Sequence, residues 1–228
     1  ALLEQIGVST SFNGNLIKVM PKASVASTQL VVESDWSSAS YFYSIVALCE
    51  VGTEITLSAY KKSSLQGDSV LAEIYLDFGV ETVFNHNKMT LKKIDRCKLS
   101  IVKYDLSNAP DTAQTIAVTC FGLGLGCHLT GLHTLKIKET DRLEALYIEL
   151  SKLGALISVT DKALTLEAST GIKSNVSIDT YNDHRMAMAF APLAIKTDIL
   201  INDAGVVSKS YPDFWKHMKA LKFKVTEL

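Results

Sequence analysis

An internal repeat constrains the fold of this chain more than any other feature. Asp35, Asp111 and Asp183 each precede a run of small and apolar residues, and they recur at intervals of 76 and 72 residues. Asp is a favoured helix N-cap, so a helix is expected to begin at each of them. Small residues throughout these runs predict helices that are buried on most sides. A chain with this period is expected to repeat one supersecondary unit around shared helices.

A second signature marks the ends of other helices. Gly7, Gly79 and Gly154 each follow an amphipathic stretch, and Lys222 stands at the fourth equivalent position. Gly in this place predicts a left-handed helix end. The Gly-rich segment 122–126 also follows a helix, so it is interpreted as a helix stop and not as a dinucleotide-binding loop. The outer helices predicted in this way are 68–78, 140–153 and 211–221.

Alternating residues predict strands between these helices. They fall at 30–33, 54–59, 80–84, 89–94, 98–104, 128–132, 155–159, 163–167, 175–178, 199–202 and 223–227. The sequence thus predicts an α/β (α+β) fold of three βαβαββ units, with boundaries 28–95, 96–170 and 171–228, the third lacking its last strand. Residues 1–20 are interpreted as a helix end and two strands that form the closing half of an earlier unit.

Composition excludes several classes of function. The formal net charge of −1 gives no reason to expect a nucleic acid or membrane surface as partner. The longest apolar run, 186–195, contains Pro192 and is far shorter than the roughly 20 residues of a membrane span. Four cysteines without CxxC pairing are interpreted as reduced core thiols of a cytoplasmic protein. The five histidines lack metal-binding spacing, so neither a metal nor a cofactor is expected.

The stretch 141–154 carries the strongest helical pattern. Asp141 and Glu144 form a predicted capping box. Glu149 and Lys152 are expected on the solvent side, opposite the apolar face. That face is expected to consist of Leu143, Leu146, Tyr147, Leu150 and Leu153.

Charged residues gather at the starts of two predicted helices. Lys138 and Arg142 lie where the helix dipole does not favour cations, so they are expected to serve an anionic ligand. His184 and Arg185 begin a buried helix, and a structural contact between Arg185 and Asp183 is the simpler interpretation there. If the Asp-capped helices align, their N-termini form one concentrated anion-binding surface.

Four segments resemble motifs of the 5-enolpyruvylshikimate-3-phosphate synthase family and follow its order. They are Glu33–Phe42, Ala109–Asp111, Lys138–Arg142 and Tyr181–Met188. The resemblance implies the enolpyruvyl transferase "inside-out" α/β barrel, in which two similar domains each contain three βαβαββ units. Residues 1–27 would then be the tail of the N-terminal domain, and 28–228 the C-terminal domain. It also implies that the missing strand is supplied by the extreme N-terminus of the full chain.

The same resemblance implies a reaction of the shikimate pathway to chorismate and the aromatic amino acids. The enolpyruvyl group of phosphoenolpyruvate moves to the 5-hydroxyl of shikimate 3-phosphate, phosphate is released, and no metal is required. Asp111 would be the base and Glu139 the group that exchanges the methylene proton. Phosphoenolpyruvate would be bound by Arg142, Arg185 and Lys209. Shikimate 3-phosphate would be bound by Asp111, Lys138 and Thr134, which stands where the family usually has the longer Asn. Supporting roles would fall to His184, Asp183 and Asp35.

Other site residues of the family lie upstream of this chain. The chain is therefore expected to carry half a site, to be inactive alone, and to need the N-terminal domain of the same polypeptide as its partner. Two alternatives stay open. One is the related transferase that acts on UDP-N-acetylglucosamine, and the other is a non-catalytic repeat scaffold that packs through its incomplete sheet edge.

Overall fold

The computed structural model describes residues 1–97 and 99–227, and the chain divides into two compact units, the second beginning at Glu33. The first unit contains α1 (Leu2–Gln5) and an antiparallel hairpin of β1 (Thr10–Asn13) and β2 (Leu16–Val19). Gly7, between α1 and β1, has a φ of +75° and reverses the chain direction. The predicted helix end and two strands are therefore present in this part of the chain.

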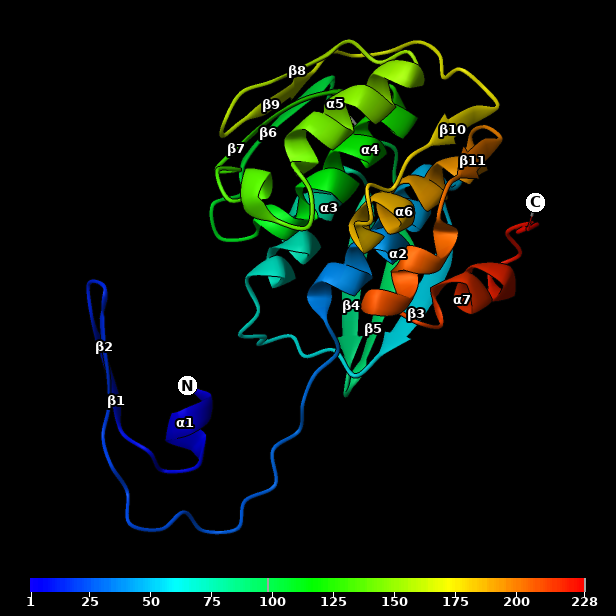
Figure 1. Ribbon diagram of the computed structural model, residues 1–228. Helices are drawn as coiled ribbons and strands as arrows, with labels where there is room; N and C mark the ends of the chain where they lie inside the picture. Colours follow the sequence, from blue (N-terminus) through cyan, green and yellow to red (C-terminus); the bar gives the residue numbers. More distant parts are fainter. Residues whose placement is uncertain (98, 228) are drawn as a thin grey trace. The chain divides into compact units, whose positions relative to one another are not determined.

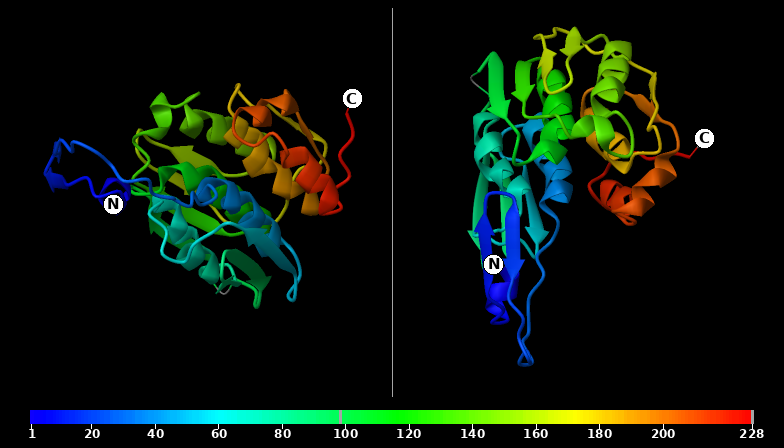
Figure 2. Two further views of the ribbon diagram at one scale, coloured as in Figure 1. Left: turned by 90° about the horizontal axis from the view of Figure 1, so that it is seen from below. Right: turned by 60° about the vertical axis from the view of Figure 1, so that its left-hand side comes forward.

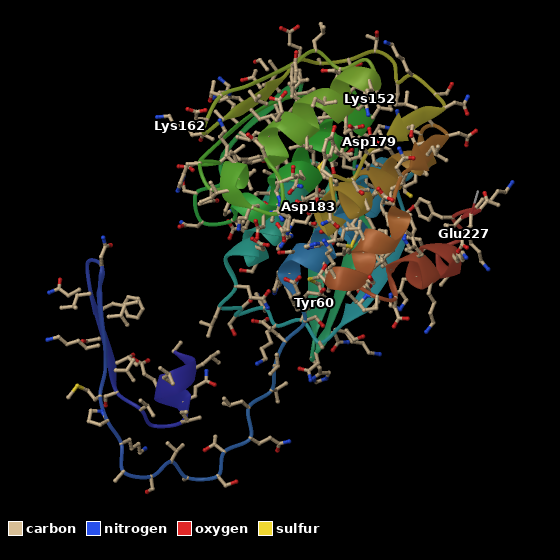
Figure 3. The ribbon with its side chains drawn as sticks, viewed as in Figure 1. Tyr60, Lys152, Lys162, Asp179, Asp183 and Glu227 are labelled. Atoms are coloured by element: carbon tan, nitrogen blue, oxygen red, sulfur yellow. The ribbon has the colours of Figure 1, made fainter. Side chains whose placement is uncertain are left out.

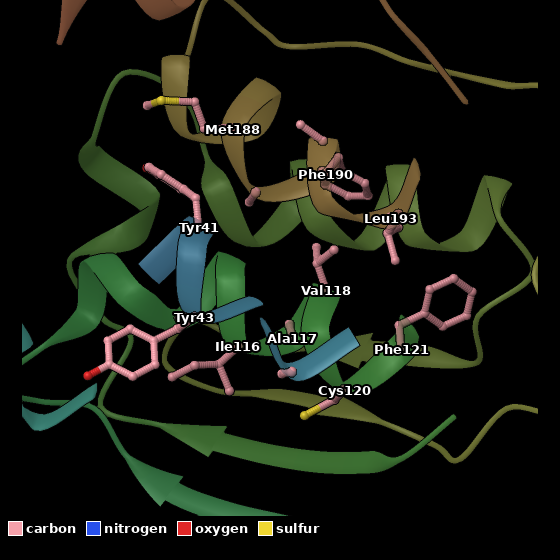
Figure 4. Packing of buried hydrophobic residues seen from close by; sticks show 14 of the residues in the cluster. Tyr41, Tyr43, Ile116, Ala117, Val118, Cys120, Phe121, Met188, Phe190 and Leu193 are labelled. Atoms are coloured by element: carbon pink, nitrogen blue, oxygen red, sulfur yellow. The ribbon is translucent and has the colours of Figure 1, made fainter. Parts of the chain in front are cut away.

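Three helices form the centre of the second unit (Figures 1 and 4). They are α2 (Trp36–Leu48), α4 (Ala113–Leu123) and α6 (His184–Phe190), the last continued by the 3₁₀ segment η4 (Ala191–Ile195). Every residue of α2 except Ser38 is buried, as the small-residue pattern predicts. The hydroxyls of Ser40 and Thr115 lie 2.9 Å apart, and Thr119 donates to Ser44 at 2.8 Å. Small polar side chains thus let α2 and α4 pack closely, because the buried hydroxyl groups of the two helices form hydrogen bonds with each other.

Three sheets pack against this helical centre (Figure 2). Leu91, Leu129 and Ile178, one from each sheet, belong to the same buried core. The first sheet is antiparallel in the order β3-β5-β4, the second has the order β6-β7-β9-β8 with β6 and β7 parallel, and the third pairs β10 and β11 in parallel. The strands are β3 (Glu54–Ser58), β4 (Val80–Asn85), β5 (Lys88–Lys93), β6 (Ile101–Asp105), β7 (Gly126–Thr130), β8 (Ile157–Val159), β9 (Leu164–Leu166), β10 (Val176–Ile178) and β11 (Ile199–Ile201).

The outer helices begin later than the sequence predicts, because turns or 3₁₀ segments precede them. They are α3 (Leu71–Asp77), α5 (Arg142–Lys152) and α7 (Phe214–Ala220). The remaining 3₁₀ segments are η1 (Gly67–Val70), η2 (Pro110–Thr112), η3 (Leu135–Ile137) and η5 (Ala204–Lys209). The Gly-rich segment after α4 is a helix stop as predicted, since Gly124 takes the left-handed conformation at its end.

Two predicted strands are wrong. Residues 30–33 are irregular, with Val31 and Val32 exposed by 62% and 86%, and residues 223–227 are irregular as well. A strand needs a neighbour to satisfy its backbone groups, and alternation of side chains alone does not supply one. Within the described residues the β10–β11 sheet accordingly has two strands. Lys98, the first residue of the predicted strand 98–104, lies outside the described residues, and β6 begins at Ile101.

The predicted outward position of Glu149 on α5 is also wrong. Its side chain is fully buried, whereas Tyr147, predicted on the apolar face, is 41% exposed. Glu149 is buried because Tyr181 donates to it at 2.6 Å and Lys152 at 2.8 Å. A hydrogen-bond donor from another part of the chain thus allows a charged residue of α5 to be buried, which the pattern of apolar and charged residues does not predict.

The helix-end signature is confirmed at all four positions. Gly7, Gly79 and Gly154 have φ values of +75°, +76° and +101°, and Lys222 after α7 has a φ of +73°. The amide of Phe223 donates to Met218 O and that of Lys222 to Lys219 O, which closes the helix with the double bond pattern of a Schellman end. A Cβ is unfavourable in this conformation, so Lys222 is accommodated at a cost in free energy.

We expect Lys222→Gly to raise the free energy of unfolding by about 0.5–1 kcal/mol, because glycine adopts the left-handed conformation without that cost. Urea unfolding followed by circular dichroism measures the change. The matched control is Lys219→Gly, inside the last turn of the same helix, which should lower the free energy by about 1 kcal/mol. Equal destabilisation by both variants would contradict the assigned role of position 222.

Candidate functional site

Charged side chains converge where α4, α5 and α6 begin. Asp111 comes from η2, Arg142 is the first residue of α5, and Arg185 lies in the first turn of α6. Arg142 Nη1 lies 2.9 Å from Asp111 Oδ1, and Arg185 Nη2 lies 3.1 Å from Asp111 Oδ2. Asp183, labelled in Figure 3, caps α6 beside them. The fold thus joins residues from three distant parts of the sequence.

Arg142 is the centre of this cluster and is only 1% exposed. Its Nε donates to Asp183 Oδ2 at 2.6 Å, its Nη1 to Asp111 Oδ1, and its Nη2 to Glu139 Oε2. Asp183 is fully buried. A buried guanidinium and a buried carboxylate are tolerated only when each neutralises the other and their hydrogen bonds are made. The rigid fork of arginine suits this geometry, since it presents several donors in one plane.

Asp111 does not cap α4, so that prediction is wrong. Thr112 occupies the N-cap position and makes no side-chain capping bond. The Asp111 carboxylate is instead held by Arg142, by Arg185 and by Lys138, whose Nζ lies 3.2 Å from Oδ1. Burial raises the pKa of Asp111, but the charges of Arg185, Arg142 and Lys138 together outweigh burial and hold the pKa below its ordinary value. Asp111 is therefore an ionised carboxylate enclosed by cations.

Asp35 and Asp183 cap α2 and α6 as predicted. Asp35 Oδ1 accepts from the Ser37 amide at 3.0 Å, and Asp183 Oδ1 accepts from the Arg185 amide at 2.8 Å. The purely structural alternative for Arg185, an ion pair between its guanidinium and Asp183, is not formed among the described residues. One oxygen of Asp183 already receives the Arg185 amide and the other receives Arg142, so the Arg185 guanidinium reaches Asp111 instead.

Glu139 and His184 flank the cluster on its more open side. The Glu139 side chain is 40% exposed. Partial burial raises the pKa of Glu139, but a backbone hydrogen bond and the positive charge of Arg142 bring it below the ordinary value. Burial, followed by the charge of Arg185, lowers the pKa of His184 below 6.5, so the imidazole is neutral at pH 7. Its buried Nδ1 has no hydrogen-bond partner among the described residues, which leaves it able to take one more bond.

Lys209 and Thr134 occupy the margins of the site. Lys209 Nζ donates to Asn182 O at 2.8 Å and to Asn182 Oδ1 at 2.7 Å, which fixes the lysine against the segment before α6. Thr134 precedes η3, and its Oγ1 is buried without a hydrogen-bond partner in the part of the chain that the structure describes. Lys209 therefore contacts the segment before α6, and no hydrogen bond joins either side chain to Arg142 among the described residues.

Asp68 is a site residue that the sequence did not reveal. It lies in η1 and accepts a hydrogen bond from the Ser37 hydroxyl at the start of α2. Burial raises the pKa of Asp68, and the nearby Ser37 and Arg185 only partly oppose this. No periodicity or motif points to Asp68, because η1 lies in a turn and its partner is 31 positions away.

Residues 1–97 and 99–227 contain neither a candidate metal site nor a candidate membrane span. No group of three or more His, Cys, Asp or Glu side chains there is placed to hold a metal ion. No helix in that part of the chain is long and apolar enough to cross a membrane. The four cysteines are free thiols, of which Cys120 and Cys127 are buried.

Comparison with known proteins identifies the family. Residues 1–218 match the family model for EPSP synthase (3-phosphoshikimate 1-carboxyvinyltransferase). The chain belongs to the EPSP synthase family. A 3-phosphoshikimate 1-carboxyvinyltransferase of Bacteroides fragilis is 38% identical over 227 residues, which is 98% of this chain and 55% of that protein. One from Shewanella piezotolerans is 34% identical over 97% of this chain and 51% of its own length.

Solved structures agree on the fold. The EPSP synthase of Acinetobacter baumannii superposes with a TM-score of 0.78 at 21% identity, over 96% of this chain and 53% of that one. The enolpyruvyl transferase NikO of Streptomyces tendae gives 0.64 at 13% identity, over 96% and 51%. These neighbours establish a mixed α/β fold shared with enolpyruvyl transferases. The chain spans about half the length of the relatives it matches.

Proposed function

We propose that this chain supplies part of an enzyme that transfers the enolpyruvyl group of phosphoenolpyruvate to the 5-hydroxyl of shikimate 3-phosphate, releasing phosphate. The observation that carries the proposal is the enclosure of Asp111 by Arg142, Arg185 and Lys138, beside Glu139. A carboxylate among several cations provides both a proton acceptor and binding groups for an anionic substrate. Membership of the EPSP synthase family supports the same reaction.

The proposed chemistry requires two proton movements. Asp111 takes the proton of the 5-hydroxyl while that oxygen bonds to C2 of phosphoenolpyruvate. Glu139 gives a proton to the methylene carbon, because its pKa rises and it becomes protonated once the substrate anion takes Arg142 from it. In the second stage that carbon returns a proton to Glu139, the bond from C2 to the phosphate oxygen breaks, and phosphate leaves with the proton that Asp111 had taken from the hydroxyl. Each acid–base role is typically worth about 10²–10⁴ in rate.

Binding of the substrate anions changes the electrostatics of the base in this proposal. Arg142, Arg185 and Lys209 hold the phosphoenolpyruvate carboxylate and phosphate, while Asp111, Lys138 and Thr134 contact shikimate 3-phosphate. Arg142 and Arg185 are paired with carboxylates in the unliganded protein, so the substrate must compete for them. Once substrate anions neutralise these cations, the pKa of Asp111 rises and the carboxylate becomes a stronger base. Asp35, Asp183 and His184 support this arrangement.

We propose the complete architecture as an extension of the same assignment. Residues 28–228 are three units of the βαβαββ type, with boundaries 28–95, 96–170 and 171–228, in one domain of an inside-out α/β barrel. In the described part of this chain the first unit lacks its leading strand and the third lacks its last two strands. Residues 1–27 are the tail of a preceding domain, and that domain completes the site. The relatives are about twice as long as this chain, which is consistent with a half-site here. Buried free thiols fit a reducing compartment such as the cytoplasm.

The test measures phosphate release from phosphoenolpyruvate and shikimate 3-phosphate. We expect none from the 228-residue chain alone, and release from a hybrid in which the N-terminal part of the Bacteroides fragilis relative precedes this chain. Release by the chain alone would overturn the half-site. If a folded hybrid releases phosphate only when UDP-N-acetylglucosamine is the acceptor, the related transferase replaces the proposed function. If a folded hybrid releases no phosphate with either acceptor, the non-catalytic scaffold replaces it.

A further inference from the structure

A buried carboxylate two turns from the site has no role in the proposed reaction. Glu149 lies on α5 and is fully buried. Its Oε1 accepts from Tyr181 Oη at 2.6 Å and from Lys152 Nζ at 2.8 Å, and its Oε2 accepts from the Asp179 amide at 3.2 Å. Burying a carboxylate costs free energy, and the three donors offset that cost. This arrangement indicates that Glu149 holds the groups that donate to it.

Glu149 and Arg142 lie on the same face of α5, because seven residues are close to two helical turns. Arg142 holds Asp183 through Nε, and Glu149 holds Tyr181 and the Asp179 amide. Both ends of segment 179–183, which connects β10 to α6, are thus attached to one helix (Figure 3). The position of this segment decides where α6 starts.

The segment between these attachments has an unusual backbone. Tyr181 and Asn182 have φ values of +52° and +57°. Asn tolerates this left-handed region, but a bulky aromatic residue rarely adopts it, so Tyr181 must be held there by its surroundings. The ring of Tyr181 packs against the core, and its hydroxyl donates to Glu149 Oε1 at 2.6 Å. Asn182 then presents both O and Oδ1 to Lys209 Nζ.

A second ion pair strengthens the attachment. Lys152 Nζ also lies 2.7 Å from Asp179 Oδ2, and Asn202 Nδ2 donates to Asp179 Oδ1 at 2.6 Å. Asp179 is therefore fixed from α5 on one side and from the end of β11 on the other.

We propose that Glu149 is a positioning residue, which holds Tyr181 in the left-handed conformation and thereby places Lys209 and Arg185 for the phosphoenolpyruvate anion. This inference rests on the proposed function. Among the described residues Glu149 hydrogen-bonds to none of the proposed site residues, and it acts through Tyr181, Asn182 and the start of α6. Lys138 and Thr134, on the shikimate side, lie on a different segment and are independent of it.

The first test needs no catalysis. We expect Glu149→Gln to accelerate hydrogen exchange of the Asp179 and Asp183 amides in the 228-residue chain by roughly 10- to 100-fold, the effect of losing a hydrogen bond to a charged group. The matched control is Glu144→Gln, an exposed acid on the same helix, which should leave both amides unchanged. Unchanged exchange in Glu149→Gln would overturn the proposed anchoring.

The second test uses the hybrid enzyme described above and separates positioning from simple destabilisation. We expect Glu149→Gln to raise KM for phosphoenolpyruvate roughly tenfold while KM for shikimate 3-phosphate stays the same, because only one set of binding groups is displaced. Loss of folded protein would instead lower kcat and leave both KM values unchanged, and that result would overturn the proposal.

Tyr181→Phe removes a single hydroxyl and provides a variant that retains the other bonds of Glu149. We expect it to shift KM in the same direction, and the double variant to show less than the product of the two single effects, since both act through one contact. If the change in KM of the double variant equals the product of the two single changes, Glu149 and Tyr181 do not act through the same contact. If the hybrid with native Glu149 forms no product, the proposed function fails, and hydrogen exchange still decides the anchoring.

Discussion

Replacing Arg142 by Met (R142M) is expected to lower the free energy of unfolding by about 3–5 kcal/mol, the typical cost of removing one partner from a buried ion pair. Methionine fills a similar length but carries no charge. Asp183, which is fully buried, would then lose the only cation within hydrogen-bonding distance in the described structure. Asp111 and Glu139 would lose a partner as well, but they keep contact with solvent or with other cations.

Urea unfolding of the 228-residue chain measures this loss, and a second substitution identifies its cause. Asn caps helices about as well as Asp. The double variant R142M with Asp183→Asn should therefore be more stable than R142M alone, because no buried charge is left unpaired. Lys136→Met is the control, since Lys136 pairs with an 88% exposed Asp161 and such pairs contribute about 0–1 kcal/mol. Equal losses in R142M and Lys136→Met would show that burial of Arg142 has no energetic consequence.

Replacing Asp111 by Asn (D111N) is expected to reduce kcat of the hybrid enzyme by about 10²–10⁴, the usual contribution of a general base. The amide retains the size of the side chain but cannot accept the proton of the 5-hydroxyl. Phosphate release measures the change, with Asp161→Asn, an exposed acid, as the control that should keep its activity. Activity of D111N near that of the unchanged hybrid would remove Asp111 as the base.

The pH dependence of stability offers a separate check on Asp111. Its pKa is lowered in the folded protein, so the unfolded chain binds this proton more readily. The stabilisation is therefore complete above the ordinary Asp pKa of 3.8 and is lost as pH falls through the lower value of the folded state. D111N should make the unfolding free energy less dependent on pH in that acidic range, without changing its dependence near pH 7.

Local features of this protein were determined by the sequence itself. The caps at Asp35, Asp141 and Asp183 and the left-handed ends at Gly79 and Gly154 all lie where the residue types predict them. Each depends on interactions within a few residues of the chain, so local spacing contains the necessary information. Burial of the small-residue helices was predictable for the same reason, because their composition leaves no polar face for solvent.

The tertiary structure alone decided which charges meet. Asp111 and Asp183 share the same sequence pattern, yet Asp183 caps a helix and Asp111 joins Arg142, Arg185 and Lys138. Glu149 has the spacing of a solvent-facing residue, but donors up to 32 positions away bury it. The strands predicted at 30–33 and 223–227 did not form, since a strand depends on a neighbour that alternation cannot provide. Each of these features depends on a partner that is distant in the sequence, and no local pattern encodes such a partner.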